Sequence, residues 1–370
     1  MSRLSSTRIL MTTDTVGGVW SYATALANRL ASFGAEVHLV TQGPQPRADQ
    51  RAMLDPTKIH LIETDLALEW QDPEAADLDR ARRALSRLDQ EIRPDIIHLN
   101  SYREATFEWH APVVLVAHSC VNSWGQACHD TTFLAEPRWQ RYSQLVAAGL
   151  GKASVWVAPT CAFGETIANL YRPPRPGVLI WNGFTPAFQS IMPKQPLILA
   201  AGRMWDKAKN LAALAAVADA VPCPIEVAGA GAEPGQQNLP IHLLGELPQA
   251  ELWQRMLGAA IFASPALYEP FGLSVLEAAA AGCALVLADI PTFRELWQDA
   301  AIFVAPADEN ALRSALSWLA ADADACTALQ RAARRRARRY TVGRMATRYA
   351  ELYLDLLGQR STQPLVESCA

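Results

Sequence analysis

Short, continuous apolar segments alternate with helical segments along the whole chain, and this alternation restricts the fold more than any other feature. Unbroken apolar runs are typical of parallel strands that helices cover on both faces. A regular succession of strand and helix therefore predicts α/β doubly wound sheets, and the segments suffice for two. The predicted strands are residues 8–13, 36–41, 95–100, 112–118, 154–159, 177–182, 197–202, 225–229, 241–245, 261–265, 284–289 and 302–305.

The length of 370 residues also favours two domains over one. Prolines are frequent in residues 171–176, and a second break in the pattern lies at residues 192–196. We place the boundary at the second break, which predicts an N-terminal Rossmann-like domain of residues 1–192 and a C-terminal one of residues 193–340. A helical segment, 341–362, follows.

Composition excludes several classes of protein. Half of the residues are hydrophobic and the net charge is only −4, so the chain is globular and gives no reason to expect a nucleic-acid partner. No apolar run is long enough to span a bilayer, and the N-terminus lacks the features of a secretory signal. The seven cysteines are scattered, without zinc-site spacing, which indicates a reduced, cytoplasmic protein.

The strongest motif is the segment from Glu269 to Glu277, which follows a predicted strand and enters a helix. Ligands of open parallel sheets bind beyond the carboxyl ends of strands, where the free amides of a first helical turn attract anions. Glu269 can reach a hydroxyl-rich group beside such an anion, and Glu277 can accept hydrogen bonds from a diol such as ribose. This spacing fits a diphosphate that joins a ribose to a sugar. Alternatively, Glu277 only begins an alanine-rich helix and Glu269 is an ordinary loop acid.

A second motif follows the strand that ends at Gly202. Arg203 comes directly after this glycine, and Lys209 lies six residues later. Two spaced cations after a strand form a suitable clamp for the charge that builds on a departing diphosphate. Lys207 is a competing candidate for the lysine.

The N-terminal half offers weaker motifs. Gly17 and Gly18 lie between the first strand and a helix predicted at 21–33, where glycines allow the backbone to approach an anion or sugar closely. His118 ends an apolar strand, at the edge where ligands bind. An ordinary turn and a structural histidine are the alternatives for these two features.

Together these motifs resemble the GT-B fold retaining glycosyltransferases of family 4, also called glycosyl transferases group 1. The family hallmark is a pair of glutamates in the frame Glu-Pro-Phe-Gly-Leu and then Glu, which residues 269–277 match without a gap. The resemblance implies two Rossmann-like domains that face each other across a cleft, with the C-terminal helix crossing back to the first domain. It also implies transfer of a hexose-type sugar from a nucleotide diphosphate sugar, most simply UDP- or GDP-linked, to a hydroxyl acceptor.

The resemblance implies specific roles as well. It assigns sugar contacts to His118 and Glu269, leaving-group charges to Arg203 and Lys209, and the ribose contact to Glu277, with His98 structural or in a supporting position. His118, Glu269, Arg203, Lys209, Glu277 and the double glycine, but not His98, are expected around one interdomain groove. The predicted donor-binding residues are Gly17, Gly18, Arg203, Lys209, Gly245, Glu269, Phe271, Gly272, Leu273, Ser274 and Glu277. The predicted acceptor residues are Trp20, Asn122, Trp124 and His129.

No metal or other cofactor is expected. Asp-x-Asp pairs, which hold Mg²⁺ or Mn²⁺ in other glycosyltransferases, occur at Asp77/Asp79 and Asp322/Asp324, but in helical surroundings rather than after a strand. An arginine-rich helical segment, 331–339, is a solvated face or a weak contact with a membrane surface. Another GT-B activity, such as a nucleotide-sugar epimerase or a sugar phosphorylase, and a catalytically silent sugar-binding protein remain as alternatives.

Overall fold

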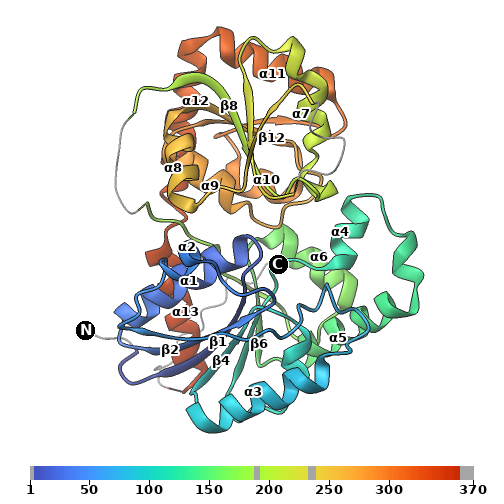
Figure 1. The fold of residues 1–370 in the computed structure, drawn as a ribbon, viewed down its shortest axis with the longest axis vertical. Helices are drawn as coiled ribbons and strands as arrows, with labels where there is room; N and C mark the ends of the chain where they lie inside the picture. Colours follow the sequence, from blue (N-terminus) through green and yellow to red (C-terminus); the bar gives the residue numbers. More distant parts are fainter. Residues whose placement is uncertain (1–3, 187–191, 232–238, 359–370) are drawn as a thin grey trace. The chain divides into compact units, whose positions relative to one another are not determined.

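The computed structural model describes residues 4–186, 192–231 and 239–358. The chain forms two compact units, one of Met1–Gly183 with Val342–Ala370 and one of Phe184–Thr341, which we call the first and second domains. Each contains a parallel sheet with helices packed on both of its faces (Figure 1). The first boundary between the two domains falls between Gly183 and Phe184, whereas the sequence analysis places it after residue 192.

The first domain is built on a seven-stranded parallel sheet of order β3-β2-β1-β4-β5-β6-β7. Its strands are β1 (Arg8–Asp14), β2 (Glu36–Gln42), β3 (Ile59–Ile62), β4 (Ile96–Leu99), β5 (Val113–Val116), β6 (Val155–Ala158) and β7 (Val178–Leu179). Every strand predicted in this half is present, and the structure adds β3. This strand escaped prediction because it is short and, as an edge strand, exposes His60 among its apolar residues, which breaks the continuous run.

The helices of the first domain form two layers, as Figure 1 shows. They are α1 (Gly18–Ser32), α2 (Ala48–Arg51), α3 (Leu78–Ile92), α4 (Val121–Ala127), α5 (Pro137–Lys152), α6 (Cys161–Tyr171) and α13 (Val342–Leu356). α1 and α13 pack together over the sheet. There the buried His98 ring of β4 bonds through Nδ1 to the Tyr353 hydroxyl at 2.6 Å and through Nε2 to the Tyr22 hydroxyl at 3.3 Å. His98 is therefore a structural residue that holds α13 on this domain.

The second domain has a six-stranded parallel sheet of order β10-β9-β8-β11-β12-β13. Its strands are β8 (Gln195–Ala201), β9 (Ile225–Ala228), β10 (His242–Gly245), β11 (Ala259–Ser264), β12 (Ala284–Ala288) and β13 (Ile302–Val304). Its helices are α7 (Leu211–Val217), α8 (Gln249–Gly258), α9 (Leu273–Ala281), α10 (Pro291–Trp297), α11 (Glu309–Ala321) and α12 (Ala323–Ala337).

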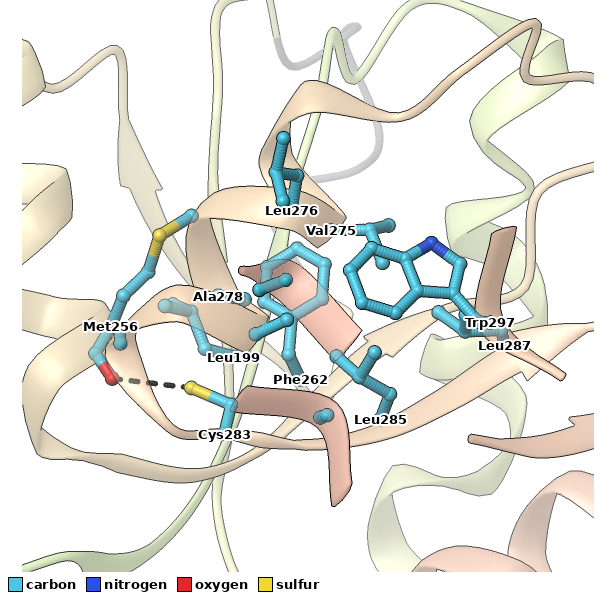
Figure 2. Packing of buried hydrophobic residues seen from close by; sticks show 14 of the residues in the cluster. Leu199, Met256, Phe262, Val275, Leu276, Ala278, Cys283, Leu285, Leu287 and Trp297 are labelled. Atoms are coloured by element: carbon cyan, nitrogen blue, oxygen red, sulfur yellow. Dashed lines mark hydrogen bonds between the residues drawn. The ribbon is translucent and has the colours of Figure 1, made fainter. Parts of the chain in front are cut away.

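One face of this sheet carries the apolar layer that positions α9. Figure 2 shows residues of α9, such as Val275 and Ala278, packed with Phe262 of β11 and Trp297 of α10. Beside them the Cys283 thiol donates to the Met256 carbonyl oxygen at 3.1 Å. These side chains are almost completely buried, and the larger apolar ones, such as Val275 and Phe262, each contribute about 1.5–3 kcal/mol by leaving water. The layer thus fixes α9, and with it the first turn of that helix, on the sheet.

Both sheets have a point where the strand order reverses, between β1 and β4 in the first domain and between β8 and β11 in the second. In doubly wound sheets the loops that leave such strands separate to opposite faces and open a crevice at the carboxyl edge. The double glycine follows β1, and Arg203 and Lys209 follow β8. Glu269 follows β11. The double glycine, Arg203, Lys209 and Glu269 therefore each follow a strand at the switch point of their own sheet.

Candidate functional site

Lys209 reaches the Glu269 carboxylate across the switch point of the second domain. Its Nζ donates to Glu269 Oε2 at 2.6 Å, and the two side chains are 20% and 15% exposed. A Cβ on Gly202 would lie 3.1 Å from the lysine stem, so the glycine leaves room for Lys209 to cross. Lys207, the competing candidate, is exposed, so Lys209 is the lysine that lies against the glutamate motif.

Arg203 lies in the same loop as Lys209 and is held by Asp206, a residue that the sequence analysis did not select. Asp206 Oδ2 accepts from the Arg203 guanidinium at 2.7 Å, while its Oδ1 accepts from the Ala208 amide and starts the short helix Lys207–Lys209. The guanidinium also lies over the Trp205 ring, 5.0 Å from its centroid. One buried carboxylate therefore sets both the guanidinium and the turn that leads to Lys209.

Two further side chains fix the loops around Glu269, and both were missed because they act through backbone groups. Asn210 Nδ2 donates to the carbonyl oxygens of Pro265 and Pro306, each at 3.0 Å. Thr292 Oγ1 donates to the Glu269 carbonyl oxygen at 2.7 Å. The sequence signal available for the first of these was an asparagine directly after the lysine, since asparagine adopts the left-handed conformation, here with a φ of 50°, more readily than most residues.

The first turn of α9 adjoins the Glu269 loop. Gly272 precedes the helix with a φ of 85°, which favours glycine, and a Cβ there would lie 3.0 Å from the Phe293 ring. Phe271 is buried, whereas Leu273 and Ser274 are the partly exposed first residues of the helix. Gly272, the N-cap residue, has no side chain to cap α9, and residues 273–275 of its first turn include no acid. These amides and the helix dipole are suited to an anion.

Glu277 lies one turn further along α9. Burial raises the pKa of its carboxyl to about 7, and a hydrogen bond with the Gln249 side chain opposes this rise. A carboxylate with so high a pKa gains stability from any hydroxyl that donates to it. Gly245 ends β10 with a φ of 70°, and its carbonyl oxygen accepts from the Gly229 amide at 2.8 Å.

In the first domain the double glycine starts α1. Gly17 has a φ of 90° and a ψ of −145°, a conformation that is essentially restricted to glycine, and Gly18 is the exposed first helical residue. No side chain caps α1 and no acid lies in its first turn. This helix start therefore has the same anion-compatible character as that of α9.

His118 follows β5 and contacts residues from two neighbouring segments. Its Nε2 lies 2.8 Å from Asn100 Oδ1, and its ring packs edge-on against Tyr22 at 4.6 Å. Asn100 Nδ2 donates to the Thr12 carbonyl oxygen, which orients the amide so that Oδ1 accepts from His118. Nδ1 is then the unprotonated nitrogen. Burial lowers the pKa of His118 to about 3, so the ring is neutral near pH 7.

The predicted acceptor residues have different environments. Trp20 is only 1% exposed and packs in the interior, so contact with an acceptor would require α1 to repack. Asn122 Nδ2 donates to Ser143 Oγ at 2.8 Å, and the partly exposed Trp124 lies 6.2 Å from the Phe133 ring. His129 is exposed and has a φ of 51°.

The Asp-x-Asp pairs lie at helix starts. Asp77 precedes α3, accepts from the Ala67 amide and pairs with Arg80, while Asp322 caps α12 by accepting from the Ala325 amide. In both pairs the second aspartate lies in the first helical turn, where its negative charge interacts favourably with the positive end of the helix dipole. These positions explain the two strings without a metal.

The arginine-rich segment lies mainly on α12, where Arg336 bonds to the carbonyl oxygens of Leu296 and Gln298 and most of the other arginines are exposed. Within the described ranges, no helix has the length and apolar character that crossing a bilayer requires.

Family models match both halves of the chain. The model for Glycosyltransferase Family 4 matches residues 16–188, and the model for Glycosyl transferases group 1 matches residues 190–336. The chain belongs to the family 4 glycosyltransferases. As a glycosyltransferase it moves a glycosyl group from a sugar donor. No curated protein sequence matches it.

Solved structures support the GT-B fold of this glycosyltransferase. Sucrose-phosphate synthase from Thermosynechococcus elongatus superposes with a TM-score of 0.76 at 18% identity, covering 96% of this chain and 100% of its own. HepE from Anabaena, in complex with UDP and glucose, gives 0.73 at 16% identity, with coverages of 94% and 100%. WaaG, a glycosyltransferase involved in lipopolysaccharide biosynthesis, gives 0.73 at 15% identity, with coverages of 94% and 99%.

Proposed function

We propose that this glycosyltransferase moves a hexose-type sugar from a nucleotide diphosphate sugar to a hydroxyl acceptor, with retention of anomeric configuration and without a divalent metal. The observation that carries the proposal is the Lys209–Glu269 ion pair at the switch point of the second sheet, which adjoins the first turn of α9, with Arg203 in the same loop after β8. Two cations and a helix N-terminus match the charge of a diphosphate, and the carboxylate matches sugar hydroxyls.

In the structure Lys209 and Glu269 neutralise each other, so binding of the donor must break this ion pair before either side chain can contact the donor. A diphosphate that takes Lys209 as its counter-ion releases the Glu269 carboxylate, which then accepts hydrogen bonds from sugar hydroxyls. Lys209 thereby exchanges one anionic partner, Glu269, for another, the leaving group, on which negative charge grows in the transition state. Arg203, oriented by Asp206, supplies a second fixed charge to the same oxygens.

In the proposed mechanism the acceptor hydroxyl attacks the face of the sugar from which the nucleotide departs. The new bond forms between the acceptor oxygen and the anomeric carbon as the bond to the phosphate oxygen breaks. The departing phosphate oxygen takes the hydroxyl proton, so no protein base is required. His118 is neutral and so supplies no positive charge to the reaction. Its unprotonated Nδ1 can accept a hydrogen bond from a hydroxyl of the donor sugar and so position the sugar ring.

The donor is best sought first among UDP-sugars, because HepE, which shares the fold, has been solved with UDP-glucose. A thermal-shift screen of UDP-, GDP- and ADP-sugars identifies the base, since a ligand that binds only the folded state raises the melting temperature. Proton NMR of the first product formed from the matching donor then gives the anomeric configuration. Inversion would contradict the proposed same-face mechanism.

The Glu269→Ala variant tests the site itself. We expect turnover to fall by about 10²–10³-fold, comparable to the loss of one preorganised transition-state contact. Asp324→Asn, which removes an exposed carboxylate from the first turn of α12 in the same domain, is the matched control and should retain wild-type turnover. Wild-type turnover in Glu269→Ala would overturn the assignment, and exchange of sugar-ring protons with solvent would indicate an epimerase instead.

A further inference from the structure

Glu36, His38 and His60 bring three potential metal-ligand atoms together on the sheet of the first domain. Their carboxylate and imidazole atoms all lie within 4.8 Å of one another. Glu36 and His38 belong to β2, two residues apart and therefore on the same face, and His60 is the register partner of His38 on the edge strand β3. The backbone of two adjacent parallel strands thus produces the cluster.

The cluster lies apart from the proposed transfer site. Along β1, His38 pairs with Leu10, whereas His98 pairs with the next residue, Met11. His38 therefore faces away from His98 and from the layer of α1 and α13. Glu36 is also the first residue of β2, at the edge opposite to the carboxyl ends that the double glycine and His118 follow.

The interatomic distances bracket those of a tetrahedral centre. Two ligand atoms, each about 2.0–2.1 Å from a tetrahedral zinc ion, lie about 3.3–3.5 Å from each other. Glu36 Oε1 lies 2.8 Å from His38 Nε2 and 4.0 Å from His60 Nε2. The imidazole rings stack with centroids 4.7 Å apart and an angle of 17° between their planes. The in-plane lone pairs of both imidazoles must point at the ion, which nearly parallel stacked rings cannot do, so coordination requires the exposed His60 ring to rotate out of the stack.

The exposure of the three side chains allows that adjustment. His38 is the anchored member, 14% exposed, whereas Glu36 and His60 are 48% and 61% exposed and accessible to an ion from solvent. Arg8 is the register partner of Glu36 on β1 and therefore lies on the same face of the sheet. Its guanidinium donates to the Ile92 carbonyl oxygen and lies 4.0 Å from the Asp95 carboxylate, so its charge is partly balanced.

We propose that Glu36, His38 and His60 form a binding site for one divalent transition-metal ion, Zn²⁺ or a similar ion, that joins the edge strand β3 to β2. Two imidazole nitrogens and one carboxylate oxygen suit Zn²⁺, Co²⁺, Ni²⁺ and Cu²⁺, whereas Mg²⁺ and Ca²⁺ prefer oxygen ligands alone. With both imidazoles neutral, the ligand set carries one negative charge. A water molecule completes the tetrahedron, and the site stabilises the fold rather than the reaction.

Calorimetric titration of the full chain with ZnCl₂, after removal of metals by a chelator and buffer exchange, tests the proposal. We expect one Zn²⁺ per chain with a rise in melting temperature, and no comparable rise with Mg²⁺ at the same concentration. His60→Ala and Glu36→Gln, both at exposed side chains that can change without unfolding the domain, should weaken Zn²⁺ binding by about tenfold or more, since metal sites are sensitive even to lost supporting contacts.

His242→Ala is the matched control, because His242 is an exposed histidine on β10 of the second domain. This variant should bind Zn²⁺ as the wild type does. Absence of Zn²⁺ binding in the wild type would overturn the proposal. Equal binding by His60→Ala and the wild type would do the same, because the ion would then occupy another site. Neither readout depends on sugar transfer.

Discussion

Replacement of Glu277 by glutamine removes a charge from a partly buried position while keeping the shape of the side chain. The pKa of this carboxyl is raised to about 7, against 4.5 for an unburied one. A carboxyl whose folded pKa is raised takes up protons on folding between these two values. The charged form therefore destabilises the second domain progressively as the pH rises from about 4.5, and fully above about 7.

The difference of about 2.5 pH units corresponds to about 3 kcal/mol, at about 1.4 kcal/mol for each unit. For a domain of this size, each kcal/mol moves the melting temperature by about 2–4 °C. At pH 8, Glu277→Gln should therefore melt about 6–12 °C above the wild type. At pH 5 the wild-type carboxyl is protonated, so the two proteins should melt within about 2 °C of each other.

Calorimetry of Glu277→Gln, the wild type and Asp324→Asn between pH 5 and pH 8 measures this effect. The control removes an exposed carboxylate and should follow the wild-type curve at every pH. The same Glu277→Gln protein should bind the nucleotide sugar about 10-fold or more weakly, because a charged acceptor of ribose hydroxyls is lost, worth about 1.5–3 kcal/mol. Equal melting of Glu277→Gln and the wild type at pH 8 would refute the reasoning, because the carboxylate would then carry no burial penalty.

Three other predictions follow from the contacts. Arg203→Ala and Lys209→Ala should each lower kcat by about 10²–10³-fold while the protein stays folded and melts cooperatively. Steady-state kinetics and calorimetry measure the two effects, and an unfolded variant or a wild-type kcat would contradict the prediction. Transfer should continue in EDTA, because the cations take the place of a metal; complete loss that Mg²⁺ or Mn²⁺ restores would contradict this. Tyr353→Phe should destabilise the first domain by about 1–3 kcal/mol, since the buried His98 Nδ1 loses its partner, and denaturant unfolding that matches the wild type would count against this role.

The local sequence was sufficient for most of the architecture. Strands such as 113–116 and 284–288 are buried on both faces, so their apolar runs are unbroken and visible without coordinates. The start of α9 was equally clear, because Gly272 and the alanine-rich segment after Glu277 are local signals of a helix boundary and interior. Strand β3 was missed because an edge strand is partly exposed, so its sequence is not a continuous apolar run.

The site divides in the same way. Glu269, Glu277, Arg203 and Lys209 were selected by their places after predicted strands together with the resemblance to the family motif, because residues that follow parallel strands collect at one edge of a sheet. The partners of these residues depended on the tertiary structure. Asp206 orients Arg203 through a turn, and Asn210 joins carbonyl oxygens that are 55 and 96 residues away along the chain.

What the sequence determined by itself was the order of strands and helices, and the residue types available beyond each strand, because burial and helix propensity act over short stretches of chain. Only the tertiary structure decided which charges neutralise each other, as in the Lys209–Glu269 pair, and which side chains are buried, as with Trp20. It also decided that His38 and His60 stand side by side. Coulombic attraction and burial depend on distances in space, and strand pairing sets those distances between residues that no local pattern connects.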